Sequence, residues 1–227
     1  MSTTKRKKKA EERLEPREAA ERLMRRVPQQ DRGQRRVEKI LDAAAEVIAE
    51  VGVEAATTNA IAARAETSVG SLYQFFPNKD AIVQALAARY VEQLRELKVA
   101  TFDGLDPHLP LPELIEATVM PMVGFHEANP AYEHVYYATN RPDAPWQPQV
   151  EVKEAVITRI AELIHTRNPA LSLDELRIYG RVTCEMVHAL ISESMRAAPA
   201  DRLRLLRELK NVMVRYLQAL EPPPAGA

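Results

Sequence analysis

Histidine, serine and cysteine are the residues of this 227-residue chain whose side chains could support catalysis or bind a metal. His126, His134 and His188 do not share a spacing typical of metal ligands, and no pair of carboxylates lies at a fixed offset from them. Ser68 and Ser71 are not part of a nucleophile elbow, and the few glycines form no phosphate-binding loop. We therefore expect no catalytic residue, no metal site and no cofactor, and a chain that is not an enzyme.

The segment from Thr57 to Lys79 has residue types suited to DNA recognition, and it reads TTNAIAARAETSVGSLYQFFPNK. Short helices over 58–65 and 69–75, separated by a break, predict a helix-turn-helix whose second helix enters the major groove. Ser68 is expected to cap that second helix. Gly70 costs the helix about 1 kcal/mol relative to alanine, and a close approach to the DNA backbone is a reason to keep it. A turn without a DNA-binding role is the alternative.

The run ARA followed by SVGSLYQFFPNKD resembles the N-terminal signature of the tetracycline-repressor family, over roughly a quarter of the chain. The resemblance implies that Thr58 contacts a phosphate at the start of its helix, and that the hydroxyl of Tyr73 donates to phosphate. It also implies that Lys79 and the free amides of its helix terminus bind a phosphate together.

The remaining exposed positions of the second helix are candidates for contacts to base edges. Gln74 suits the hydrogen-bonding edge of adenine, and the methyl groups of Val69 suit the methyl group of thymine. Core packing is the alternative for Phe75, Phe76 and part of Tyr73. The DNA-binding candidates are Thr58, Ser68, Val69, Gly70, Ser71, Tyr73, Gln74 and Lys79.

Charge is distributed unevenly along the chain. Many members of the family have Gly-Val in the turn where this chain has Glu66 and Thr67, so Glu66 either accepts a strained backbone or alters the turn. Residues 37–90 carry four Lys/Arg against seven Asp/Glu, whereas residues 1–36 carry 13 against 6. We expect residues 1–33 to form a basic, mostly disordered arm that neutralises DNA phosphates, with a solvated tail as the alternative.

The spacing of apolar residues predicts an all-α fold. A helix-turn-helix domain over 34–96, with its motif at 57–76, is joined by a long fourth helix to a larger helical domain over 97–220, followed by a flexible tail over 221–227. The expected helices cover 35–51, 58–65, 69–75, 79–100, 114–127, 131–138, 150–165, 172–197 and 201–220, with a loop over 141–148.

By resemblance, the larger domain binds an effector and forms a homodimer. The helices over 172–197 and 201–220 would pair with their twofold mates and hold two recognition helices about 34–36 Å apart. An unidentified, largely apolar small molecule would bind among the helices, although core packing is the alternative for each candidate. The pocket candidates are Met120, Met122, Phe125, Tyr132, Tyr136, Tyr137, Trp146, Met186 and His188.

The expected function is that of a ligand-responsive repressor released from a pseudopalindromic operator in double-stranded DNA. The alternative is a helical interaction or adaptor protein on the same scaffold that no longer reads DNA. Repression and activation leave the same sequence pattern. Because no apolar run is long enough for a membrane span or a secretion signal, we expect a cytoplasmic protein without membrane contact. The single cysteine, Cys184, is expected to be a core residue.

Overall fold

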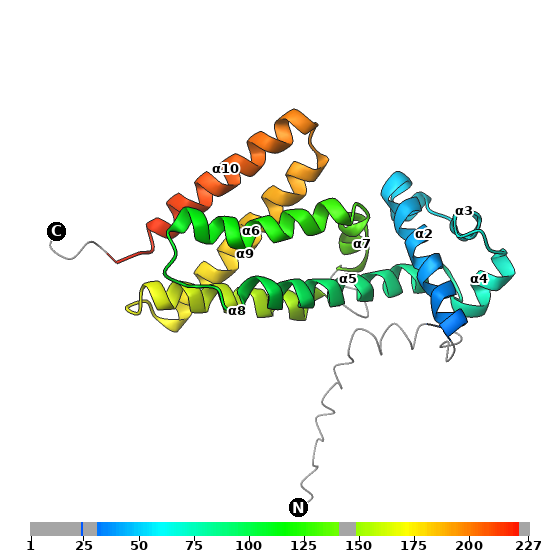
Figure 1. Cartoon of the computed structure of the whole chain (residues 1–227), viewed down its shortest axis with the longest axis horizontal. Helices are drawn as coiled ribbons and strands as arrows, with labels where there is room; N and C mark the ends of the chain where they lie inside the picture. The colour runs from blue at the N-terminus through cyan, green and yellow to red at the C-terminus, as the bar shows by residue number, and fades with distance from the viewer. Residues whose placement is uncertain (1–23, 25–30, 141–148, 223–227) are drawn as a thin grey trace, which may run out of the picture.

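The computed structural model describes residues 31–140 and 149–222, together with Met24. All regular elements of this described part are α-helices, which confirms the all-α prediction (Figure 1). They are α2 (Asp31–Ala55), α3 (Thr58–Arg64), α4 (Val69–Phe75), α5 (Lys79–Phe102), α6 (Leu111–Ala128), α7 (Tyr132–Thr139), α8 (Gln149–Arg167), α9 (Leu173–Arg196) and α10 (Pro199–Gln218). Trp146 with its loop, and most of the basic arm and of the C-terminal tail, lie outside the described residues.

Helix α2 begins earlier than the apolar spacing predicts. Its first residue is Asp31, so Gly33 lies inside the first turns instead of ending the preceding segment. A carboxylate in the first turn interacts favourably with the helix dipole, which helps to extend the helix towards the N-terminus. Near the other end, Gly52 has a φ of 76° and a ψ of 169°, and this non-helical backbone interrupts the helix directly after the predicted range of 35–51.

Helices α3 and α4 form the expected helix-turn-helix against α2. Thr57 caps α3 by accepting a hydrogen bond from the amide of Ala60 at 3.1 Å, and Ser68 caps α4 by accepting one from Ser71 at 3.1 Å. Ile61 and Leu72 are fully buried, so each short helix is fixed by an apolar face in the shared core. Packing of this kind compensates for helices too short to be stable alone.

Helix α5 belongs to both halves of the molecule. Figure 1 shows it leaving the helix-turn-helix at one end and running along the larger body. Asn78 caps its first turn, and Ile82, Leu86 and Tyr90 are buried in the same core as α2, α3 and α4. Helix α7 packs against both α2 and α5. The helix-turn-helix domain is therefore connected to the larger body by two helices, the continuous α5 and the packed α7.

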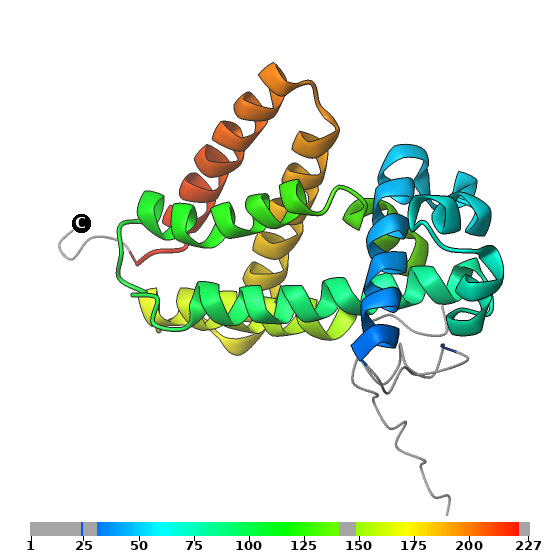
Figure 2. The same ribbon diagram turned by 45° about the vertical axis from the view of Figure 1, so that its right-hand side comes forward.

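The larger body is built from α5, α6, α8, α9 and α10, and Figure 2 shows α9 crossing behind α6 towards α10. Helix α9 begins with a capping box, because Ser172 and Glu175 exchange backbone and side-chain hydrogen bonds. Where α8 and α9 cross, a Cβ on Gly180 would lie 2.8 Å from the carbonyl oxygen of Ile157. The glycine therefore permits the close approach of these two helices.

Candidate nucleic-acid interface and interior cavity

Two predicted phosphate ligands lie side by side on the helix-turn-helix. The Thr58 hydroxyl at the start of α3 is 3.2 Å from the Tyr73 hydroxyl on α4. The Tyr73 side chain is among the few large, partly apolar groups that remain exposed, at 38%. Two adjacent hydroxyls on one exposed edge form a site that can donate to a phosphate oxygen.

The other candidates of α4 divide into exposed and internally bonded groups. Gly70 and Gln74 are exposed, and Val69 is half-buried against the core. The Ser68 hydroxyl donates to the Ser71 hydroxyl at 2.9 Å, so part of the hydrogen-bonding capacity of both serines is used within the helix cap. The exposed candidates of α4 that make no hydrogen bond within the helix cap are Gly70, Gln74 and Tyr73.

Phe75 and Phe76 are core residues, as one of the two sequence interpretations proposed. Phe76 is fully buried and Phe75 nearly so, and both belong to the cluster shared by α2, α4 and α5. They hold α4 in place and offer no surface to a nucleic acid.

The turn residue Glu66 has a positive φ of 49°, so of the two outcomes that the sequence left open, Glu66 accepts a strained backbone. Its carboxylate accepts a hydrogen bond from Lys39 of α2 at 2.5 Å. The Lys39 ammonium group lowers the pKa of Glu66 below its ordinary value. The negative charge of Glu66 in the turn is therefore compensated by a lysine from a different helix.

The other cations of this domain are also engaged within the chain. Arg64 bonds the carboxylates of Glu46 and Glu50 at 2.9–3.0 Å. Arg89 forms an ion pair with Asp42 at 2.6 Å. All four Lys and Arg side chains between positions 37 and 90 thus have internal partners, because Lys39 and Lys79 are bonded as well.

Lys79 is placed differently from the role that the resemblance implies. Its ammonium group donates to the carbonyl oxygens of Val53 and Glu54 at 2.8 and 3.0 Å, closing the C-terminal end of α2. A positive charge at this position interacts favourably with the free carbonyls of a helix end. Phosphate binding by the Lys79 side chain stays a prediction.

Free positive charge near the reading helices is concentrated at the start of α2. Arg32, Arg35 and Arg36 are exposed, and none forms an ion pair with another residue of the described part. The predicted binding of DNA phosphates by residues 1–33 stays a prediction, because most of those residues lie outside the described part.

A cavity of about 170 Å³ lies inside the larger body, between α5, α6, α8, α9 and the end of α10. Four sequence candidates belong to its wall, namely Met122, Tyr132, Tyr136 and His188. Burial lowers the pKa of His188 and raises that of both tyrosines, so these three side chains are uncharged at neutral pH. The wall is otherwise mainly aliphatic.

Four other pocket candidates do not line this cavity. Phe125 packs edge-to-face with Tyr132 at a ring-centroid distance of 5.0 Å and lies in the first core. Tyr137 points outwards with 55% of its surface exposed. Met120 and Met186 pack against the second core cluster, built from α6, α9 and α10. Trp146 lies outside the described residues.

The wall residues on α5 and α8 were not singled out from the sequence, although these two helices supply much of the cavity lining. Val152, Val156 and Ile160 on α8 face Leu94 and Leu97 on α5 across the cavity. Their three-and-four spacing is visible in the sequence, but an identical spacing describes helix faces that fill a core. Nothing in the pattern alone distinguishes these two outcomes.

The buried histidine His126 takes part in a polar cluster with Glu133 and Ser192. His126 is buried with its Nδ1 3.1 Å from a carboxylate oxygen of Glu133, which also accepts a hydrogen bond from Ser192 at 2.7 Å. Burial by itself raises the pKa of Glu133, but the contacts with His126 and Ser192 bring it below its ordinary value. The cluster joins α6, α7 and α9, and no group of three potential metal ligands is found among the described residues.

None of the helices in the described ranges combines the length and apolarity that a membrane span requires. The chain matches two family models, "Bacterial regulatory proteins, tetR family" over residues 40–86 and "Tetracyclin repressor-like, C-terminal domain" over residues 110–217. These two matches cover the helix-turn-helix with the start of α5, and the body from α6 to α10.

Individual proteins resemble the chain in part or throughout. The HTH-type nicotine-responsive transcriptional repressor of Paenarthrobacter nicotinovorans is 41% identical over 69 residues, which is 30% of this chain and only 36% of that repressor. A TetR-family regulator from Streptomyces coelicolor is 25% identical with a TM-score of 0.56, covering 82% of this chain and 99% of its own. A Rhodococcus transcriptional regulator, 19% identical, shares the fold with a TM-score of 0.64 over 81% and 95% of the two chains.

The helix-turn-helix packed on α2, the long α5 and the helical body with its cavity agree with both family matches and with these neighbours. The chain therefore belongs to the tetracycline-repressor family of bacterial transcriptional regulators.

Proposed function

We propose that this protein is a dimeric, effector-responsive repressor that binds a pseudopalindromic operator through α3 and α4. The observation that carries the proposal is the exposed edge formed by Thr58, Tyr73, Gly70 and Gln74, mounted on a rigid core and connected by α5 to an apolar cavity. The 41% identity to a nicotine-responsive repressor supports a repressing role, although that match covers about a third of the relative.

The dimer would form through the outer faces of α9 and α10. Leu173, Ile178, Leu203 and Val212 leave 41–78% of their surfaces exposed on these two helices. Large apolar side chains so exposed on adjacent helices are typical of an interface that a second copy covers. A twofold axis there would place two copies of α4 about 34–36 Å apart, one turn of DNA.

Effector binding would act on the reading domain through shared helices. Helix α5 contributes wall residues to the cavity and core residues to the helix-turn-helix. Helix α7 contributes Tyr132 and Tyr136 to the cavity while packing on α2, where His134 lies beside Gly52. An effector that favours a different arrangement of α5 and α7 would lower DNA affinity, and DNA would lower effector affinity by the same factor.

The direct test is fluorescence anisotropy with a labelled duplex taken from upstream of the protein's own gene, against a scrambled duplex of equal composition. We expect the genuine duplex to bind at least 100-fold more tightly at about 150 mM salt. Tyr73→Phe should weaken binding about 5- to 10-fold, because it removes one phosphate hydrogen bond and little packing. Tyr137→Phe, in an exposed tyrosine of α7, is the matched control and should bind like the parent protein.

The adaptor function is the second candidate, and one observation favours it. Every cation of the domain between positions 37 and 90 has an internal partner, which leaves the reading surface with little free positive charge. Equal binding of the genuine and scrambled duplexes, with no effect of Tyr73→Phe, would favour this alternative over the repressor.

A further inference from the structure

The cavity is elongated along one face of α8. Its wall residues on this helix run from Gln149 to Arg167, which places the two ends roughly 27 Å apart at 1.5 Å per residue. Helix α5 runs parallel to α8, since Arg95 pairs with Glu151 and Arg159 donates to the carbonyl of Phe102. A volume of about 170 Å³ distributed over this length describes a narrow space rather than a round one.

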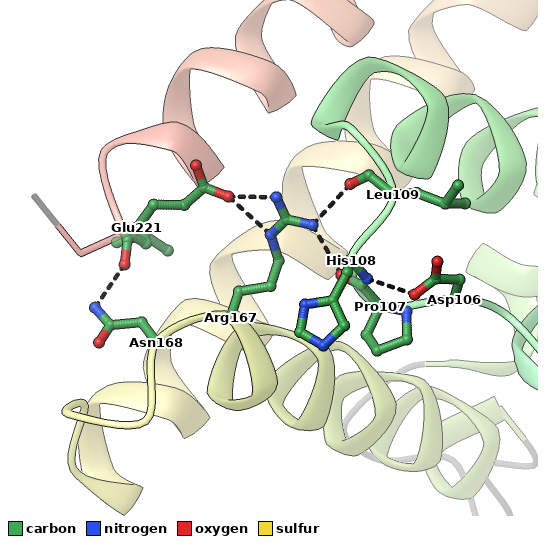
Figure 3. Close-up of polar contacts among 8 residues, drawn as sticks. Asp106, Pro107, His108, Leu109, Arg167, Asn168 and Glu221 are labelled. Carbon is green, nitrogen blue, oxygen red and sulfur yellow. Dashed lines mark hydrogen bonds and ion pairs between the residues drawn. The ribbon is translucent and has the colours of Figure 1, made fainter. Parts of the chain in front are cut away.

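The Arg167 side chain at one end of the cavity is held by contacts within the chain. Figure 3 shows the guanidinium held by Glu221 on one side and by the carbonyls of Pro107 and Leu109 on the other. Nε and one terminal nitrogen bond the carboxylate, and the other terminal nitrogen donates to both carbonyls at 2.8 Å. The charge is compensated and the donors are almost all used, so this guanidinium has little capacity left to bind an incoming polar group.

Polar groups without partners gather at the opposite end. Gln149 and Thr183 are 3% and 5% exposed, belong to the cavity wall, and come from α8 and α9. The carbonyl oxygen of Gln149, the hydroxyl of Thr183 and Nε2 of His188 have no hydrogen-bond partner within the described structure. Buried polar atoms are normally paired, so a bound molecule that satisfies them is favoured.

The orientation of the Gln149 amide follows from its neighbour. The Thr139 hydroxyl donates to the carbonyl of Val135 at 2.8 Å, so it can only accept from Gln149, whose amide nitrogen lies 3.4 Å away. The unpaired atom of Gln149 is therefore an acceptor. It requires an N–H or O–H donor from its ligand.

The charges around this end are already compensated. Lys153 forms an ion pair with Glu185 at 2.7 Å, and burial lowers the pKa of His188, which keeps the imidazole neutral. Lys98 is the charged wall residue that has no ion pair with the described residues, and it is partly exposed, so its ammonium group can remain in water. The wall thus favours an uncharged polar group.

We propose that the effector is an uncharged, elongated and mainly apolar molecule with one N–H or O–H donor, bound along α8 with its polar end at Gln149, Thr183 and His188. This assignment rests on the proposed function, in which the cavity is the effector site. It narrows that function to a chemical class of ligand.

The test uses the full-length chain and displacement of N-phenyl-1-naphthylamine, whose fluorescence increases in apolar surroundings. The competitors are decan-1-ol, butan-1-ol, decanoate and decyltrimethylammonium. We expect decan-1-ol to displace the probe at concentrations at least tenfold lower than each of the other three. Equal or better displacement by decanoate would overturn the assignment in favour of an anion held by Lys98, and equal displacement by butan-1-ol would overturn the elongated shape.

Two variants locate the polar end. Thr183→Val removes the hydroxyl at constant shape and should weaken decan-1-ol binding 5- to 10-fold. The binding of 1-methoxynonane should weaken less, because its ether oxygen can accept from this hydroxyl but has no proton to donate. Gln149→Met removes the acceptor and should weaken decan-1-ol binding 5- to 10-fold while leaving 1-methoxynonane binding unchanged. This variant serves as the test if Thr183→Val fails to fold. Thr158→Val is the matched control, because that exposed hydroxyl on α8 bonds only its own helix at Glu154. An equal loss for the alcohol and the ether in both variants overturns the placement.

Operator binding is measured on the same preparation, so that a failure of the proposed ligand class can be distinguished from a failure of the proposed repressor function. Specific operator binding without the expected order of competitors contradicts the ligand class and leaves the repressor function standing. The expected order of competitors without specific operator binding supports the ligand class and contradicts the repressor function.

Discussion

Gly70 is the residue whose identity the fold explains least. It lies in the first turn of α4, and a Cβ built on it would meet no atom closer than the Ser68 hydroxyl at 4.0 Å. A glycine in a helix costs about 0.5–1 kcal/mol relative to alanine, so packing alone would favour alanine here. A close approach of the DNA backbone gives a physical reason for the missing side chain.

Gly70→Ala should therefore separate stability from DNA binding. We expect the free energy of unfolding to rise by about 0.5–1 kcal/mol in urea denaturation, and operator affinity to fall several-fold in anisotropy. Gly124→Ala is the matched control, since that exposed glycine of α6 also has open space around its Cβ. The control should gain stability and keep its affinity. Unchanged operator binding in Gly70→Ala would remove the DNA-based explanation.

At the scale of elements, α9 and α10 have two contrasting faces. Inside, α9 approaches α8 so closely at Gly180 that an added methyl group would collide with the backbone of Ile157. Outside, Ile178 and Leu203 leave 61% and 73% of their surfaces exposed. The inner face therefore packs within the subunit, and the outer apolar face is the one through which the proposed dimer would form.

Leu203→Glu should dissociate the dimer, because it places a charge in a desolvated apolar contact. We expect light scattering coupled to size exclusion to show a mass near that of one 25.5 kDa chain at micromolar concentration. Operator binding should weaken strongly, since two half-sites are no longer bound together. Val99→Glu, an equally apolar and exposed position on α5, should remain dimeric. A dimeric Leu203→Glu protein would place the interface elsewhere.

In the molecule as a whole, the unpaired positive charges in the described part of the N-terminal domain are not on the exposed edge of α3 and α4. The body of the helix-turn-helix uses its cations internally, Glu66 with Lys39 among them, while Arg32, Arg35 and Arg36 remain exposed at the start of α2. The sequence before α2 adds ten Lys/Arg and five Asp/Glu over residues 1–30. If the proposed function is correct, we expect electrostatic attraction to phosphates to come mainly from the N-terminal side and contacts to bases to come from α4.

Deleting residues 2–30 should weaken operator binding at least tenfold near 100 mM salt and make its salt dependence shallower. The slope of log K against log salt should fall by about 0.9 for each phosphate that the arm neutralises in the parent protein. Replacing residues 5–9 by glutamine keeps the chain length and should reproduce part of the effect, which distinguishes charge from chain length. An identical slope in the parent and shortened proteins would show that the arm neutralises no phosphate.

The amino-acid sequence by itself determined the helices, the helix-turn-helix and the family resemblance. These features depend on residues close together in the chain, such as the caps at Thr57, Ser68 and Ser172 and the three-and-four spacing of α2. Such local signals act whatever the rest of the chain does. The start of α2 at Asp31 was missed because first-turn residues carry no apolar spacing.

Only the tertiary structure decided which apolar faces enclose a cavity and which fill a core. Val156 and Ile160 line a space because α8 lies parallel to α5, whereas Met120 and Phe125 of α6, equally apolar, are covered by other helices. The pairing of Glu66 with Lys39 and the use of Lys79 to close α2 join residues more than 20 positions apart. These contacts depend on how distant helices pack together, which no local pattern records.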